Sequence, residues 1–517
     1  MPTERPNIVF IFADDLGYGD VSCLNPDGRI PTPNIDRVAA GGMSFTDAHS
    51  TSAVCTPSRY GVLTGRYNWR SRLQAGIVGV FGAPLIGEET PTVPGLLQQN
   101  GYHTACIGKW HLGWDWPLEE AGRFVPDREE PAPPVSEEVR AEWQEAFSRP
   151  ITGGPTTRGF DHYFGVDVPN WPPYVWIEDD RTLGIPSEYL PAERVRQGGG
   201  GPSEFGRYGG DMDLASLPGP AMPGWSFEPI LPTLGDRACA YIRGQSRTPD
   251  PFFLYLPLTS PHTPLAVNDD WKGQSGLDLY ADFVMETDAV VGRVLEALQD
   301  AGVADRTLVM FASDNGCAPY IGVRDLEEEG HNPSGPYRGY KADVWDGGHR
   351  IPLLARWPEH IAAGSTCDQT VCLSDLMATG ADILDAPPAD NAGPDSVSLL
   401  PLLEGDDTAV RKEVVHHSIS GRFAIRRGKW KLVLCPGSGG WCPPTDREAA
   451  QQGLPPVQLY DMEADPGETT NFQSEYPEVV EDLTDHLQSL VDRGRSTPGP
   501  ELENDVPVDI FKRDQDR

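Results

Sequence analysis

The sequence predicts an α/β fold, with a large mixed sheet sandwiched between helices and a smaller C-terminal antiparallel sheet closed by a helix. Through most of the chain, apolar runs typical of buried strands alternate with segments of helical periodicity, which is the pattern of βαβ units. After about Pro401, short strands of alternating polarity replace that pattern. We therefore expect a main domain over residues 1–400 and a C-terminal subdomain over residues 401–517.

The individual elements follow from the apolar runs and their periodicity. In the main domain, strands are expected at residues 8–12, 104–107, 251–258 and 307–311, and helices at 34–40, 93–100 and 277–299. In the C-terminal subdomain, strands are expected at 422–427, 429–434 and 457–461, and a closing helix at 476–493.

Two stretches interrupt the main domain and are predicted to be insertions. Residues 117–155 are acidic and rich in proline, with a helical piece at 136–147, and residues 181–232 are rich in glycine and proline. Long loops in a compact domain often carry function. The insertions are therefore either lids over a substrate cleft or surface decoration.

Composition limits the classes of partner and of compartment. The formal net charge of the 517 residues is −36, which argues against nucleic acid or an anionic membrane as the partner. No segment approaches the roughly 18 apolar residues that cross a bilayer. The N-terminus lacks the pattern of a signal peptide. We expect a cytoplasmic protein if Met1 is native, and a periplasmic or secreted one if a leader was removed.

The cysteine count fits the same two alternatives. Nine cysteines, an odd number, suit a reducing compartment in which they stay free. In a secreted protein, Cys435 could pair with Cys442, or Cys367 with Cys372.

Two predicted strands end in side chains that carry hard oxygen atoms. Asp14 and Asp15 follow the first strand, and Asp314 and Asn315 follow the strand at 307–311. Carboxylates and an amide, without a cluster of thiolates or imidazoles, suit one divalent cation, Ca²⁺ first and Mg²⁺ as the alternative. One Asp-Asp pair alone is often a solvated turn, but open α/β sheets bind ligands at this edge.

Basic side chains recur in short loops that follow other predicted strands. Lys109 and His111 lie in Gly-Lys-Trp-His, His262 lies in Ser-Pro-His, and Lys341 lies in Arg-Gly-Tyr-Lys. Each has an ordinary structural explanation when taken singly. Together they could neutralise an anionic ester and supply the proton that its leaving oxygen needs.

The pentapeptide Cys55-Thr56-Pro57-Ser58-Arg59 has the form C-x-P-S-R. Alone, it could be a buried cysteine before a Pro-Ser turn. With the Asp-Asp pair after the first strand and the segment 459–468 (Leu-Tyr-Asp-Met-Glu-Ala-Asp-Pro-Gly-Glu), it makes the chain resemble the type I, formylglycine-dependent sulfatases. The likeness spans almost the whole chain and is to the arylsulfatase A and N-acetylgalactosamine-6-sulfatase branch of the alkaline phosphatase superfamily.

The resemblance implies a fold, an activity and a set of site residues. It implies a large alkaline-phosphatase-like domain and a sulfuric ester hydrolase that releases inorganic sulfate from an aryl or carbohydrate sulfate ester. It implies that a formylglycine-generating enzyme oxidises residue 55 and that the aldehyde hydrate is the nucleophile. The implied metal ligands are Asp14, Asp15, Asp314, Asn315 and the modified Cys55. The implied catalytic residues are Cys55, Arg59, Lys109, His111, His262 and Lys341.

The resemblance also implies roles for the proton-transfer groups. Asp314 is a candidate base for the attacking hydroxyl, and His262, helped by Lys341, would protonate the leaving oxygen. His111 would then take the proton from the second hydroxyl as sulfate leaves. Asp346 departs from the family pattern, which has Glu before Gly-Gly, and this position is expected to affect substrate specificity.

Two other functions compete with this interpretation. One is a phosphonate monoester or phosphodiester hydrolase on the same scaffold, since sulfate and phosphate esters have similar shapes. The other is a non-catalytic, sugar-binding relative, which should lack one of the catalytic residues, and none is missing.

The substrate contacts are predicted from aromatic and basic residues near the expected loops. Exposed aromatic rings could stack on sugar rings or could simply pack the insertions. The candidates are Arg72, His103, Trp114, Trp171, His349 and Arg350.

Overall fold

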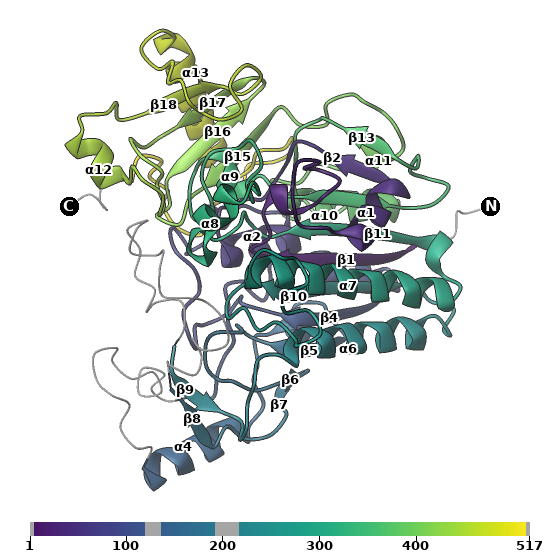
Figure 1. Cartoon of the computed structure of the whole chain (residues 1–517). Coiled ribbons are helices and arrows are strands. Elements are labelled where there is room, and N and C mark those ends of the chain that lie inside the picture. The colour runs from purple at the N-terminus through teal and green to yellow at the C-terminus, as the bar shows by residue number, and fades with distance from the viewer. Residues whose placement is uncertain (1–4, 119–135, 192–216, 513–517) are drawn as a thin grey trace.

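Two sheets of unequal size organise the chain (Figure 1). The computed structural model describes residues 5–118, 136–191 and 217–512. The larger sheet has ten strands of mixed direction, and the smaller one, near the C-terminus, has four antiparallel strands. The predicted α/β fold class is therefore confirmed. The boundary expected at residue 400 stays a prediction.

The centre of the large sheet is parallel. The order across the sheet is β13 (Ser365–Cys367), β2 (Met43–Phe45), β12 (Leu353–Arg356), β11 (Thr307–Ser313), β1 (Asn7–Asp14), β10 (Phe252–Pro261), β4 (His103–Lys109), β5 (His162–Val166), β6 (Ile177–Glu178) and β7 (Arg181–Thr182). From β11 to β5 all neighbours pair in parallel, and Ile8 lies opposite both Phe253 and Leu308. The carboxyl ends of these strands therefore share one edge of the sheet.

Side chains of β1 alternate between the two faces of the sheet, as the pleat requires. Val9 and Ile11 pack in a core with residues of α1 (Pro33–Ala40), α6 (Ile230–Gln245) and α7 (Leu279–Asp300). Ile8 and Phe10 pack in a second core with residues of α2 (Cys55–Thr64), α3 (Val93–Gln99) and α10 (Leu376–Ile383). Figure 1 shows α6 and α7 running along one face. The large sheet is thus the middle of three layers.

The C-terminal sheet carries its own core. Its strands are β15 (Glu413–His417), β16 (Phe423–Arg427), β17 (Trp430–Val433) and β18 (Gln458–Asp461). The expected closing helix is present as α13 (Pro477–Asp492), and its Leu483 and Leu487 pack with Phe423 and Ile425. Strand β15, which the sequence patterns did not predict, brings this sheet against the main domain: the carbonyl of His417 accepts the backbone N–H of Ala53 at 3.0 Å.

The remaining elements are short. They are β3 (Ala48–His49), β8 (Glu188–Leu190), β9 (Gly219–Ala221), β14 (Val371–Cys372), α4 (Glu137–Phe147), α8 (Val323–Glu328), α9 (Asp346–His349), α11 (Leu400–Leu403) and α12 (Asp446–Gln451). Helix α4 confirms the helical piece expected in the first insertion. Residues 119–135 and 192–216 of the two insertions lie outside the described residues.

The structure bears on the predictions about disulfides and about membrane-spanning segments. All nine cysteines are free, so neither of the two conceivable disulfides is formed. Among the described residues, no helix is long and apolar enough to cross a membrane.

Candidate active site

Four neighbouring parallel strands deliver charged side chains to the same edge of the large sheet. Asp14 is the last residue of β1, and Asp314 follows β11 directly. Lys109 is the last residue of β4, and His262 follows β10 directly. The strand order β11-β1-β10-β4 places these four positions side by side. Topology therefore gathers residues that are far apart in the sequence.

Helix α2 brings Cys55 and Arg59 to this edge. Cys55 is the first residue of the helix, and all ten helix residues are buried. One ligand atom each from Asp14, Cys55 and Asp314 lies within 4.8 Å of the others. Arg59, one helical turn after Cys55, places its Nη2 atom 2.8 Å from Asp314 Oδ2 and 3.4 Å from Asp14 Oδ1. The cysteine and the guanidinium thus share the helix face that points to the acidic residues.

Two oxygen atoms of the acidic group lack a hydrogen-bond donor. Asp14 Oδ1 and Asn315 Oδ1 are buried, and neither accepts a hydrogen bond. The amide of Asn315 donates to Asp15 Oδ1 at 2.8 Å, and the backbone N–H of Asp15 donates to Asp314 Oδ1 at 3.1 Å. Buried acceptors without donors are costly, and a cation would satisfy both. The four residues therefore fit a hard divalent cation.

The pKa shifts of the carboxyl groups also indicate a site for a divalent cation. Burial alone would raise the pKa of Asp14, but Lys109, His262 and Arg59 hold it well below its usual range. For Asp314, burial and then the adjacent Asp14 carboxylate raise the pKa well above its usual value, despite Arg59. Two buried carboxylates this close repel each other. A divalent cation between them would remove that repulsion.

Two lysines border the acidic group. Lys109 Nζ lies 2.7 Å from Asp14 Oδ2, and Lys341 Nζ lies 2.7 Å from Asp15 Oδ2. Both lysines are buried. Burial lowers the pKa of Lys341, but the Asp15 carboxylate and further nearby groups, Asp14 among them, together raise it well above the usual value. Lys341 therefore stays charged and can face an anionic ligand.

The two histidines present different ring atoms. The backbone of His111 is in the left-handed region, with φ of 52°, and its Nε2 lies 3.2 Å from the carbonyl of Val78. A carbonyl only accepts, so Nε2 carries the proton, and the unpartnered Nδ1 is free to accept one. His262 Nδ1 donates to the Thr263 carbonyl at 2.5 Å, which leaves its Nε2 3.6 Å from Asp15 Oδ2. Both rings thus offer an acceptor nitrogen.

Burial sets the charge of both rings. Burial, and then the neighbouring Lys109, lowers the pKa of His111 to about 3. Burial lowers the pKa of His262 to about 4, with Lys341 adding to the effect and Asp15 opposing it. Both imidazoles are therefore neutral near pH 7 when no ligand is bound.

Asp167 belongs to this site and was not predicted. It directly follows β5, and its Oδ1 accepts the backbone N–H of His111 at 3.1 Å and the indole N–H of Trp114 at 3.1 Å. A run from Tyr163 to Val166 without charged residues, followed by an aspartate, is the same signal that singled out Asp14. Reading β5 as a further parallel strand would have revealed it.

The predicted substrate contacts fall in different places. Trp171 is half-buried, and its ring lies edge-on to the His111 ring with centroids 5.4 Å apart, so it borders the site. Arg72 is exposed and donates to the carbonyls of Ala83 and Pro84. It thereby ties down the loop that follows Val78, the residue whose carbonyl binds His111.

The positions of His103 and Trp114 do not fit the sugar contacts predicted for them. His103 begins β4, so the length of the strand, roughly 20 Å at 3.3 Å per residue, separates it from Lys109. Trp114 is 1% exposed, and its ring packs against Trp110 and Tyr163. The prediction failed for Trp114 because this residue lies in a loop as expected, but its side chain packs inward and is buried.

His349 and Arg350 also disagree with the predicted sugar contacts. His349 is fully buried, and Arg350 Nη1 lies 2.9 Å from Asp47 Oδ1 and 3.1 Å from Asp346 Oδ2. Asp346, expected to affect specificity, is itself buried and lies 2.7 Å from Lys431 Nζ of the C-terminal sheet. These residues join the two sheets and do not line a substrate cleft.

Comparisons with known proteins give the family. The Sulfatase family profile matches residues 6–386 of the chain. The chain belongs to the sulfatase family. It is 31% identical to the N-acetylgalactosamine-6-O-sulfatase of Bacteroides thetaiotaomicron, over 95% of this chain and 94% of that protein. It is 32% identical to human arylsulfatase A, over 92% of this chain and 86% of that protein.

Solved structures agree with the family assignment. A sulfatase from work on glycosaminoglycan metabolism by Bacteroides thetaiotaomicron superimposes with a TM-score of 0.77 at 28% identity, covering 94% of this chain and 99% of the other. The phosphonate monoester hydrolase of Agrobacterium radiobacter is more distant, with a TM-score of 0.56 and 20% identity over 94% of this chain and 95% of the other, and shows the shared fold alone. The predicted family, the alkaline-phosphatase-like fold and sulfate ester hydrolysis are thereby confirmed.

Proposed function

We propose that this sulfatase hydrolyses a carbohydrate sulfate ester with a formylglycine derived from Cys55 and one divalent cation, Ca²⁺ first. The observation that carries this proposal is the position of Cys55. It is at the start of α2, with its sulfur among ligand atoms of Asp14 and Asp314 that lie within 4.8 Å of one another. An aldehyde hydrate at this position would have its oxygen beside the cation ligands and the lysines.

The cation would be held by Asp14, Asp15, Asp314 and Asn315, with an oxygen of residue 55. When bound, it supplies a positive charge that polarises a sulfate oxygen and favours an ionised nucleophile. When present as the hydrate, the formylglycine supplies the attacking oxygen and the second hydroxyl whose loss of a proton releases sulfate.

The cationic side chains of the chain itself would orient and neutralise the sulfate. Lys109 and Lys341 each lie 2.7 Å from a carboxylate of the acidic group, so they border the space that a sulfate bound there would fill. Arg59 is held by Asp314 and Asp14, and it fixes the acidic group rather than the ester. With the cation bound, these side chains would give the site a local positive charge on a chain whose net charge is −36.

Proton transfer falls to the two histidines. The unpartnered Nδ1 of His111 would accept a proton from the hydrate as sulfate leaves. His262 would give a proton to the leaving oxygen from Nε2, because Nδ1 is engaged with the Thr263 carbonyl. An anionic ester beside His262 raises the pKa of its ring and so favours the protonated form that this step needs.

The substrate class is proposed from the relatives and from Trp171. Relatives at about 30% identity include N-acetylgalactosamine-6-sulfatases from a bacterium and from mammals, so a 6-O-sulfated hexosamine is the first substrate to test. The half-buried Trp171 beside His111 would offer a stacking surface for a sugar ring.

The test combines activity with the chemical state of residue 55. We would measure sulfate release from N-acetylgalactosamine 6-sulfate, nitrophenyl sulfate and a nitrophenyl phosphonate, with the mass of the Cys55 peptide as a control for oxidation. We expect the sulfates to be cleaved far faster than the phosphonate. Cys55→Ala should abolish turnover and keep the fold. Sulfate release at the wild-type rate by that variant would contradict the proposal.

A further inference from the structure

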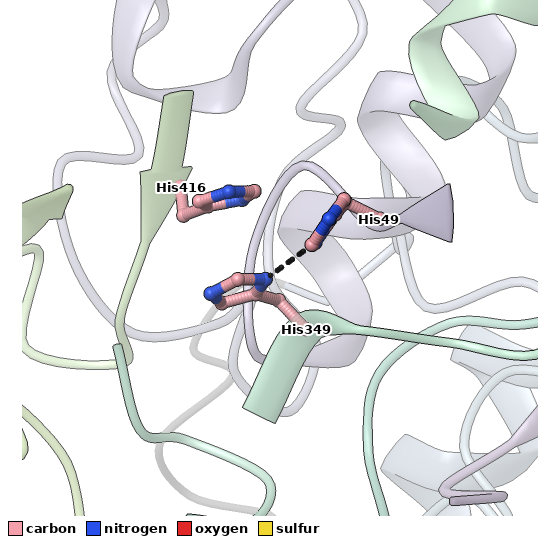
Figure 2. A group of neighbouring side chains, drawn as sticks. All are labelled: His49, His349 and His416. Atoms are coloured by element: carbon pink, nitrogen blue, oxygen red, sulfur yellow. Dashed lines mark hydrogen bonds between the residues drawn. The ribbon is translucent and has the colours of Figure 1, made fainter. Parts of the chain in front are cut away.

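Three histidines form a buried group outside the candidate active site, which we call the histidine cluster. His49 ends β3, His349 ends α9 and His416 lies in β15. Figure 2 shows the three rings gathered at one point, each arriving from a different segment. All three side chains are fully buried, and one nitrogen of each ring lies within 4.8 Å of the other two.

Hydrogen bonding leaves two ring nitrogens of this cluster facing each other. His49 Nε2 lies 2.8 Å from Asp47 Oδ1, and His349 Nε2 lies 3.1 Å from the Val344 carbonyl. Asp47 and the Val344 carbonyl only accept. When both Nε2 atoms carry the protons for these bonds, both Nδ1 atoms carry lone pairs. The two Nδ1 atoms are 3.1 Å apart. Two lone pairs at that distance repel unless a positive charge lies between or beside them.

The third ring has no hydrogen bond at all. Neither ring nitrogen of His416 has a partner, although the residue is fully buried. Its ring stacks on His349 with centroids 3.6 Å apart and an angle of 11° between the planes. An unsatisfied buried nitrogen destabilises the fold, and no hydrogen bond prevents this ring from turning toward the other two. A bound ion would satisfy it.

We propose that the histidine cluster binds one transition-metal ion, with Zn²⁺ as the representative, through one nitrogen of each ring. Neutral imidazoles are ligands for this class of metal, whereas the oxygen-rich group at the active site suits Ca²⁺ or Mg²⁺. Two nitrogens on one tetrahedral zinc lie about 3.4 Å apart, from Zn–N bonds of about 2.1 Å. The observed separation of 3.1 Å between His49 Nδ1 and His349 Nδ1 is close to this value.

The surroundings of the histidine cluster support a ligand role. Burial lowers the pKa of all three histidines, so the rings are neutral and ready to coordinate. The Asp47 carboxylate fixes the orientation of the His49 ring, as carboxylates behind metal-binding histidines do. An ion held there would fasten β15 of the C-terminal sheet to β3 and α9 of the main domain.

A different position of the proton on the His349 ring is the competing explanation for the short contact between the two Nδ1 atoms. Lys431 Nζ lies 3.2 Å from His349 Nε2, as well as 2.7 Å from Asp346 Oδ1 and 2.8 Å from Glu468 Oε1. If the lysine donated to Nε2, His349 would carry its proton on Nδ1 and donate it to His49. That arrangement needs no metal, and it leaves His416 unsatisfied.

The test measures metal binding directly and does not depend on sulfatase activity. The full chain, stripped of metal and then saturated with Ca²⁺, would be titrated with Co²⁺ as a spectroscopic probe and then with Zn²⁺. We expect one further equivalent of Co²⁺ with visible ligand-field bands, its displacement by Zn²⁺, and a rise in Tm with Zn²⁺. Absence of a second bound metal, or a Tm that responds to pH and not to Zn²⁺, would overturn the proposal.

Matched variants locate the ligands. His416→Phe keeps a stacked ring without nitrogen donors, and it should lose the Co²⁺ bands and the Tm rise with Zn²⁺. His417→Phe replaces the next residue on β15, a buried histidine outside the cluster, and should keep both responses. His49→Gln provides a second test from another segment if His416→Phe fails to fold. Retention of the bands in a folded His416→Phe or His49→Gln variant would contradict the assignment.

Discussion

Asp167 Oδ1 accepts the backbone N–H of His111 at 3.1 Å and so holds this histidine in a left-handed backbone conformation, with φ of 52°. A non-glycine residue in this region is strained, and such strain persists only where neighbours enforce it. The bond therefore positions the ring whose Nδ1 has no hydrogen-bond partner.

We expect Asp167→Ala to release this constraint. Its kcat should fall about 10²-fold, the size of effect that a misplaced catalytic group produces, while the circular dichroism spectrum stays unchanged. Asp167→Asn keeps an acceptor oxygen and should retain most of the activity. Equal losses in both variants would show that the charge of Asp167, and not its hydrogen bond, is what matters.

Removal of the divalent cation should destabilise the protein and abolish activity together. Chelation would leave Asp14 Oδ1 and Asn315 Oδ1 without a hydrogen-bond donor or cation ligand contact in the buried acidic group, so we expect a lower Tm that added Ca²⁺ restores. Asn315→Ala removes one ligand oxygen and should weaken Ca²⁺ binding at least about tenfold, as measured by calorimetry. Unchanged Ca²⁺ affinity in this variant would exclude Asn315 as a ligand.

Trp171 should contribute to the binding of a sugar more than to the chemistry. Trp171→Ala removes the ring beside His111, and we expect KM for a sulfated hexosamine to rise roughly tenfold, equal to about 1.4 kcal/mol, with a smaller change in kcat. Trp176→Ala is the control, because the Trp176 ring stacks on Phe164 away from His111. A similar rise in KM in both variants would indicate a general loosening of the segment around residues 171–176.

Asp288 makes the stability of the fold depend on pH. Its carboxylate accepts the backbone N–H groups of Asn34 and Ile35 at the start of α1, yet burial outweighs these bonds and raises its pKa from 3.8 to about 6. Between these values the folded state binds more protons than the unfolded state. The contribution of Asp288 to stability is therefore present at low pH and is lost as the pH rises through about 6.

The variant Asp288→Asn should lack this dependence. From pH 4 to pH 7, the unfolding free energy of the wild type should fall relative to the variant by about 2.4 kcal/mol, measured by urea denaturation at each pH. Asp288 lies in α7, and Asp300 is at the exposed end of that helix. The variant Asp300→Asn should show the same pH profile of unfolding free energy as the wild type. Parallel pH profiles for the wild type and Asp288→Asn would contradict the shifted pKa.

Much of the large sheet could be predicted from the sequence because its central strands are continuous apolar runs. The expected strand at residues 8–12 lies within β1, and the expected strand at 307–311 lies within β11. The Asp and Asn residues that follow them were found for the same reason. Strand β15 and helix α6 were missed because their apolar residues are interrupted by histidines, glycine or arginine.

Side-chain direction limited the prediction of the site. His349 and Arg350 were expected at a cleft as basic residues near the expected loops, but α9 directs them into the contact with the C-terminal sheet. The tertiary contact that decides this, from Asp346 to Lys431, joins residues 85 positions apart. Periodicity and spacing within one segment carry no information about such a partner.

The strand order of the large sheet also sets the timing of assembly during translation. The amide of Asn315 bonds to Asp15 across 300 residues of sequence, since β1 is paired on one side by β11. At synthesis rates of 5–20 residues per second, β1 waits roughly 15 to 60 s for that partner to emerge from the ribosome. Cys55 is buried in the finished fold, so the modification proposed above would have to take place before the sheet closes. A nascent chain that ends before residue 315 has neither the completed sheet edge nor the full set of cation ligands.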